Sequence, residues 1–200
     1  MNRELDFDEV AKLAAASAEA LAGYPRELAG MVGEMTLWLE RHRLPGLALL
    51  AGWLEHAPAF DADAAGPVID EQGMVSFPDP FIGGMFVVDR FDTWTLPGLM
   101  EGPQHGAVLM TPFLAMAAHK RSMPLEIVFF GDEATQGEAG RLTYREGKSV
   151  FEGKMNVLDG VRRIGISRPE FLARQPQAPL EAVVTVDQSV LGRLTPPRAN

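Results

Sequence analysis

The spacing of apolar residues changes along this 200-residue chain, and the change limits the folds that it can adopt. Up to about residue 57, apolar side chains recur every three to four positions, as they do in amphipathic helices. From Arg141 onward they alternate with polar side chains, as in half-buried strands. Helices and strands segregated in this way predict an α+β fold, in which an N-terminal three-helix segment is followed by a mixed, largely antiparallel sheet with short helices.

The N-terminal segment is divided by residues that start and stop helices. Asp6 is an N-cap candidate with a glutamate three residues later, which is the spacing of a capping box, and Gly23 ends the helix that begins there. Pro25 suits the first turn of a second helix, which residues 44–46 (Leu-Pro-Gly) interrupt. A third helix is predicted from there to about His56. Short connections of this kind predict helices that pack as antiparallel neighbours.

The remainder of the chain is predicted to alternate between short strands and short helices. We expect residues 57–66 to be a linker or exposed loop, residues 97–106 a loop, and Thr111 the N-cap of a helix. Glu146-Gly147 and Asp159-Gly160 are expected at hairpin turns. Strands are predicted at 67–69, 74–77, 125–130, 141–145, 148–151, 155–158, 161–166 and 182–186. We expect a helical segment at 1–57 and an α+β segment at 67–194 to form one compact domain.

Composition excludes several chemistries. The chain has no cysteine, which excludes disulfides, thiolate catalysis and cysteine-ligated metal sites. Its formal charge of −9 disfavours a nucleic-acid partner, because phosphates would be repelled. The first hundred residues hold sixteen acidic and six basic residues, whereas residues 141–174 hold eight basic and four acidic ones. This asymmetry predicts either an anion-binding surface or attraction between the two halves, within one fold or across a homo-oligomer.

The chain shows no sign of a membrane or export segment. Acidic residues occupy the N-terminal positions where a signal peptide carries basic ones. No apolar run approaches the roughly 18 residues that a membrane-spanning helix requires. We therefore expect a cytoplasmic protein without a membrane partner.

His105 is the candidate catalytic residue. It lies in a Gly/Pro-rich loop that begins at Glu101, and loops of this kind often carry functional side chains. Glu101 or Asp132 could orient His105 as a general base, and Arg141 or Arg163 could hold the carboxylate of a small anion. The alternative is an exposed loop histidine that makes one hydrogen bond.

The other histidines and the usual sequence motifs offer no competing site. His42, His56 and His119 fall at predicted helix C-termini, where the helix dipole favours an imidazolium. No histidine pair has the i, i+4 spacing of a helical metal site, so no metal is predicted. The sequence contains no nucleophile elbow, P-loop or dinucleotide fingerprint, and it indicates no particular cofactor.

Two segments resemble a known family. Residues 11–55, which contain Trp38-Leu39 before the Leu-Pro-Gly of residues 44–46, resemble a bacterial family of about this length known only as a domain of unknown function. Residues 106–130, with Pro112-Phe113-Leu114, are similar to the middle of that family. The resemblance implies no activity and no functional residue. The opening helices also resemble the malate/lactate dehydrogenase superfamily that lacks a Rossmann fold, but residues 44–46 replace its histidine-containing motif, so that chemistry is not carried over.

These observations lead to two hypotheses for function. The first is a non-catalytic accessory or small-ligand-binding protein that self-associates. The second is a cofactor-independent enzyme, or a binder of small carboxylate anions, that uses His105 with Glu101 or Asp132 and an arginine from residues 141–174.

Overall fold

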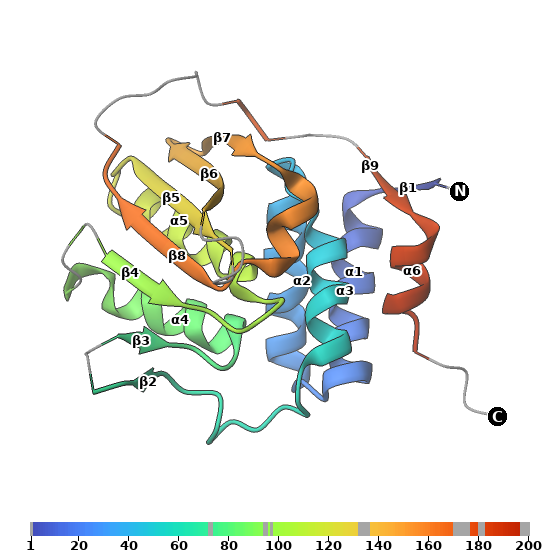
Figure 1. Cartoon of the computed structure of the whole chain (residues 1–200). Coiled ribbons are helices and arrows are strands. Elements are labelled where there is room, and N and C mark those ends of the chain that lie inside the picture. The colour runs from blue at the N-terminus through green and yellow to red at the C-terminus, as the bar shows by residue number, and fades with distance from the viewer. Residues whose placement is uncertain are drawn as a thin grey trace.

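The computed structural model describes residues 2–71, 74–93, 96, 98–131, 137–169, 177–179 and 183–196, and it has an α+β fold. A layer of helices lies beside a twisted sheet that carries two more helices (Figure 1). The α-helices are α1 (Phe7–Ser17), α2 (Arg26–Arg41), α3 (Gly46–His56), α4 (Pro80–Arg90), α5 (Thr111–Lys120) and α6 (Gln188–Leu194). The strands are β1 (Asn2–Leu5), β2 (Val68–Ile69), β3 (Val75–Ser76), β4 (Gly98–Glu101), β5 (Leu125–Phe130), β6 (Glu138–Arg145), β7 (Lys148–Gly153), β8 (Arg163–Ser167) and β9 (Val184–Asp187).

Local sequence signals start and stop the first helix as expected. The capping box before α1 is present, with Asp6 Oδ1 accepting from the Glu9 amide at 2.8 Å and the Glu9 carboxylate accepting from the Asp6 amide. A short π-helix, η1 (Ala18–Ala22), extends α1 to Gly23, whose φ of 73° is the left-handed conformation that glycine adopts most easily. Asp79 caps α4, directly before the proline at its first position. Among the described residues, no helix combines the length and the apolar character that would let it cross a membrane.

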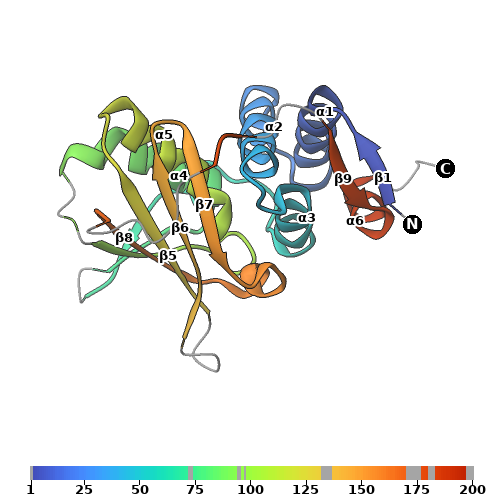
Figure 2. The ribbon, with the colours of Figure 1, turned by 90° about the horizontal axis from the view of Figure 1, so that it is seen from above.

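The main sheet has the strand order β2-β3-β4-β8-β5-β6-β7 within the described residues, and only the β3–β4 pair is parallel. Helices α4 and α5 cover one face of this sheet, and α1, α2 and α3 stand beside it (Figure 2). Strand β5 shows the alternation that this arrangement requires, because Leu125, Ile127 and Phe129 are buried while the residues between them are only partly buried. The buried apolar residues of the helices and the sheet form one continuous core.

Strands near the two ends of the described chain pair with each other. The first of them, β1, was not predicted from the sequence. Strand β1 pairs antiparallel with β9, and α6 then packs against α3 and α1 (Figures 1 and 2). Ser17 Oγ donates to the Leu194 carbonyl at 2.6 Å, which fixes the end of α6 on α1. The C-terminal end of the expected α+β segment therefore lies with the helical layer rather than with the main sheet.

Two local predictions were wrong because tertiary contacts outweigh the local pattern. Residues 98–101, expected as loop, form β4, which pairs with β8 along its whole length. Residues 155–158, expected as a strand, lie in a 3₁₀ helix, η4 (Met155–Gly160), whose Leu158 side chain is buried in the core against α3. Asp159-Gly160 therefore ends η4 and is not a hairpin turn, whereas Glu146-Gly147 does form the β6–β7 turn.

Two predictions for single side chains were also wrong. Thr111 is the first residue of α5 rather than its cap, because a further 3₁₀ helix, η3 (Ala107–Met110), runs directly into it. The Oγ1 atom of Thr111 is buried and has no hydrogen-bond partner within the described residues. His42 does end α2, but burial lowers its pKa to about 4, so the ring is neutral near pH 7 instead of an imidazolium. The predicted helix after Ser167 lies outside the described residues.

Candidate functional site

His105 is held in an unusual backbone conformation just before η3. Its φ is 64°, in the left-handed region that histidine enters more often than most non-glycine residues. The next residue, Gly106, packs so closely that an added Cβ would lie 2.9 Å from the Trp53 ring and 2.8 Å from Pro103. The neighbouring packing therefore fixes the loop and the direction of the His105 side chain.

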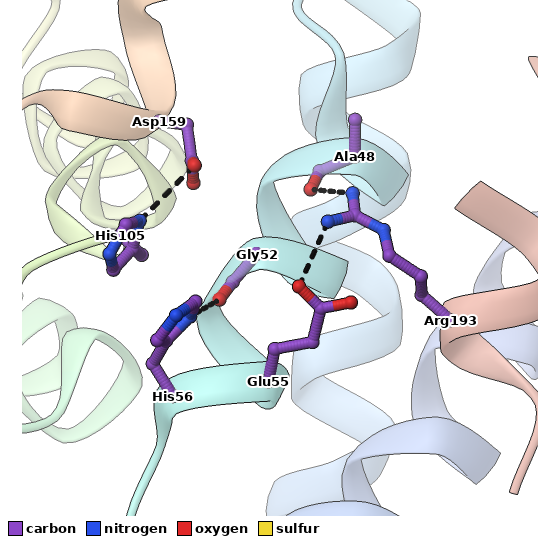
Figure 3. Close-up of polar contacts among 7 residues, drawn as sticks. All are labelled: Ala48, Gly52, Glu55, His56, His105, Asp159 and Arg193. Carbon is purple, nitrogen blue, oxygen red and sulfur yellow. Dashed lines mark hydrogen bonds and ion pairs between the residues drawn. The ribbon is translucent and has the colours of Figure 1, made fainter. Parts of the chain in front are cut away.

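Asp159 is the hydrogen-bond partner of His105. The His105 Nδ1 atom lies 3.1 Å from Asp159 Oδ2, and the two side chains come from the loop before η3 and from the end of η4 (Figure 3). Asp159 reaches this position because residue 52 on α3 is glycine. A Cβ there would lie 2.4 Å from Asp159 Oδ1. The contact between Asp159 and His105 therefore requires that residue 52 has no side chain.

A second histidine lies against the first. The rings of His56 and His105 stack with centroids 4.2 Å apart and an interplanar angle of 17°. His56 Nδ1 lies 2.9 Å from the Gly52 carbonyl oxygen, which only accepts, so Nδ1 is the protonated nitrogen. By the same argument His105 Nδ1 donates to the Asp159 carboxylate. A ring that carries its proton on Nδ1 alone keeps Nε2 as a lone-pair acceptor, the arrangement that a general base requires.

Helix α3 carries Gly52 and His56, and a salt bridge ties this helix to α6. Arg193 Nη1 lies 3.0 Å from Glu55 Oε2, and Nη2 donates to the Ala48 carbonyl at 3.5 Å (Figure 3). Both charged side chains are more than a third exposed, so the pair contributes little to stability. It joins α6 to the end of α3 that carries His56.

The other predicted site residues lie on the sheet. Glu101 and Arg163 are cross-strand partners on β4 and β8, with their charged atoms 3.9 Å apart. Arg141 on β6 contacts Glu126 and Glu138, each at 3.0 Å. The structure thus brings Glu101 and Arg163 together, but carboxylates of the sheet itself balance both arginines. Asp132 lies outside the described residues.

Sequence reasoning missed Asp159, Gly52 and the His56 stack. Asp159-Gly160 has the composition of a hairpin turn, so its local pattern pointed away from a functional role. His56 was correctly placed at a helix C-terminus, and its bond to Gly52 is the helix-end contact expected there. No local signal indicates that η4 and α3 meet, because their contact depends on the whole fold.

A pocket of about 710 Å³ borders Asp159 on the sheet side. It lies beside η4, where β6 begins and β7 ends, and much of its wall is glycine backbone. At Gly153, where φ is 154°, a Cβ would lie 2.5 Å from the Cα of Gly140, so the two strands approach here more closely than side chains allow. Polar side chains that line the pocket include Glu152, Lys154 and Asn156.

Neither a metal-binding cluster nor a match to a known protein indicates what this site does. Among the residues that the structure describes, no group of three or more histidine, aspartate or glutamate side chains is placed to hold a metal ion. The fold and this cluster define an α+β chain with a histidine–aspartate pair beside a glycine-lined pocket. Comparisons with protein-family models, with curated proteins and with solved structures find no match. The family resemblance inferred from the sequence therefore stays a prediction.

Proposed function

We propose that this chain is a small-ligand-binding protein and that its ligand occupies the 710 Å³ pocket beside Asp159. The observation that carries the proposal is the pocket itself, whose volume lies within the range of about 300–1,000 Å³ typical of small-molecule sites. Its glycine backbone allows a ligand to approach peptide groups closely, and a few polar side chains converge on it.

The polar lining favours a ligand that is neutral and polar. Lys154 and Asn156 offer donors, and Asp159 offers a carboxylate acceptor, whereas the Glu138 carboxylate is already paired with Arg141. With Glu138 balanced by Arg141, the described lining still holds two further carboxylates and one lysine, which disfavours an anionic ligand. This composition supports a hydroxylated or amide-bearing molecule over the carboxylate anion considered from the sequence.

A pocket-filling substitution tests the binding site. Gly160 lines the pocket, and an added Cβ would meet nothing within 4 Å, so Gly160→Leu should enter free space without a clash. We expect a thermal-shift screen of neutral sugars, polyols and amides to find a ligand that raises the melting temperature of the wild type in a saturable way. Gly160→Leu should abolish that rise.

Gly30→Leu is the matched control, because Gly30 on α2 is also exposed and its Cβ would also meet nothing within 4 Å. This variant should keep the full response to the ligand. A ligand that stabilises Gly160→Leu as much as the wild type would show that it binds elsewhere and would refute the assignment of this pocket.

The contact between His105 and Asp159 supports a second candidate function, acid–base catalysis without a cofactor. In this version Asp159 orients His105, whose ring is not part of the described pocket lining, and Nε2 exchanges a proton with a part of the bound molecule that extends past Asp159. Asp159 takes the place of Glu101 and Asp132 as the residue proposed to orient the His105 ring. Self-association also stays a proposal, which light scattering across a range of protein concentrations would test.

His105→Asn separates the two functions, because asparagine tolerates the left-handed backbone but cannot act as the base. If the chain is an enzyme, it should catalyse incorporation of deuterium from D₂O into the ligand identified by the screen. His105→Asn should then slow that exchange by about 10²- to 10⁴-fold while leaving ligand affinity nearly unchanged. Equal exchange rates in both proteins would exclude His105 as the base and leave the binding function alone.

A further inference from the structure

A second cavity, of about 260 Å³, is lined by Trp53 and lies between the end of α3 and the start of α4. Residues 57–66 form one wall, because the Phe60 amide donates to the Ala22 carbonyl at 2.8 Å and draws this segment onto the helical layer. The segment expected to be a linker or exposed loop therefore forms part of the wall of this cavity.

The lining of this cavity is aromatic and acidic. Trp53 and Phe60 line it together with Asp61 and Asp79, and the remaining described lining residues are proline and alanine. Tyr24 lies directly behind, with its ring centroid 5.1 Å from that of Phe60. No basic side chain belongs to the described lining. Aromatic rings combined with carboxylates are the surroundings that attract organic cations.

The buried carboxylate of Asp79 lines this cavity, and most of its hydrogen-bond acceptor sites are already occupied. Oδ1 accepts from the Phe81 and Ile82 amides at 2.8 and 2.9 Å, and Oδ2 accepts from Tyr24 Oη at 2.5 Å. A carboxylate has about four lone-pair sites, so about one remains. A ligand that needed several N–H bonds to Asp79 would find too few acceptors, whereas a cation without N–H groups needs none.

The charge of Asp79 is incompletely balanced. All three of its hydrogen-bond donors are neutral, and in the described part of the chain it forms no salt bridge. The N-terminus of α4 supplies only a partial positive charge. Burial raises the pKa of this carboxyl even though its hydrogen bonds favour the ionised form. A cation in the cavity would balance the remaining negative charge of Asp79.

We propose that the cavity lined by Trp53, Phe60 and Asp79 binds a small quaternary ammonium group. The rings would contact its methyl groups through cation–π attraction, and Asp79 would supply the opposite charge without a direct hydrogen bond. This site is separate from the glycine-lined pocket, since Gly160 and the strands around it take no part in the described lining of this cavity.

Titration calorimetry of the full chain with tetramethylammonium chloride tests this proposal. We expect saturable binding, with neopentyl alcohol (an uncharged molecule of similar shape) and sodium chloride at equal ionic strength giving none. Phe60→Leu removes a ring but keeps an apolar side chain, and it should weaken binding by roughly two- to thirty-fold. Asp79→Asn keeps a residue that can cap α4 but removes the charge, and it should abolish binding.

Three comparisons decide the outcome. Gly160→Leu should bind tetramethylammonium as tightly as the wild type, so failure of the proposed ligand pocket would leave this result unchanged. Phe60→Leu provides the test if Asp79→Asn does not fold. Absence of saturable binding, equal binding of neopentyl alcohol, or undiminished binding by Phe60→Leu would each overturn the proposal.

Discussion

Replacement of Gly33 by alanine should destabilise the protein by about 1–3 kcal/mol, because α1 and α2 approach each other closely at this point. An added Cβ would lie 2.5 Å from the Ala11 carbonyl oxygen and 3.3 Å from the Ala15 Cβ. The nearest atom belongs to the backbone of α1, so the helices would have to separate and lose packing along their interface. Gly33→Val should have a larger effect, since it adds two more methyl groups at the same place.

Gly30 provides the control within the same helix. It lies three residues before Gly33 on α2, and an added Cβ there would meet nothing within 4 Å. Gly30→Ala should therefore stabilise the protein by about 0.5–1 kcal/mol, the ordinary gain from replacing glycine in a helix. Urea unfolding of the two variants measures both changes in the free energy of unfolding. Similar changes in both would show that the close contact at Gly33 has no energetic consequence.

The elements that were predicted from sequence are those whose signals are local. The cap at Asp6, the turn at Glu146-Gly147 and the strand at 125–130 each depend on a few consecutive residues, and the structure confirms them. The α+β class follows from the same signals, because the chain separates its helical periodicity from its strand periodicity. These features bring most of the helices and strands close to their true bounds.

The candidate site could not be predicted, because it depends on contacts between distant segments. His105 was identified from its loop, but its partner Asp159 is 54 residues away at the end of a helix that was read as a strand and a turn. The glycine that admits Asp159 lies on a third element, where nothing in the local sequence distinguishes Gly52 from other helix glycines. Similarly, only the folded chain shows that carboxylates of the sheet balance Arg141 and Arg163.

The stability conferred by Glu40 should fall as the pH rises toward and beyond 7. This side chain, 9% exposed, lies in the last turn of α2, and its Oε1 accepts from the Leu47 amide at 2.8 Å. Burial raises the pKa of Glu40 to about 7, although backbone hydrogen bonds from Leu47 and Gly46 act in the opposite direction. Between the ordinary pKa of 4.5 and this value the folded state holds a proton that the unfolded chain has released. The contribution is therefore complete below pH 4.5 and is lost as the pH rises through 7.

Glu40→Gln should remove this dependence while keeping the acceptor for Leu47. The difference in free energy of unfolding, wild type minus Glu40→Gln, should become about 3 kcal/mol less favourable to the wild type between pH 4.5 and pH 8. Urea unfolding at several pH values in that range, at constant ionic strength, measures the difference.

The comparison must be between the two proteins at each pH, because a neighbouring group acts in the opposite direction. Burial, with Arg41 and Arg43 adding repulsion, lowers the pKa of His42 to about 4. The unfolded chain then binds the extra proton below about pH 6.5, so the contribution of His42 grows as the pH rises from 4 to 6.5. This contribution is present in both proteins and cancels in the difference. Parallel stability curves for wild type and Glu40→Gln would contradict a buried, neutral Glu40, whereas curves that diverge above pH 5 would show that α3 begins on a protonated carboxyl group.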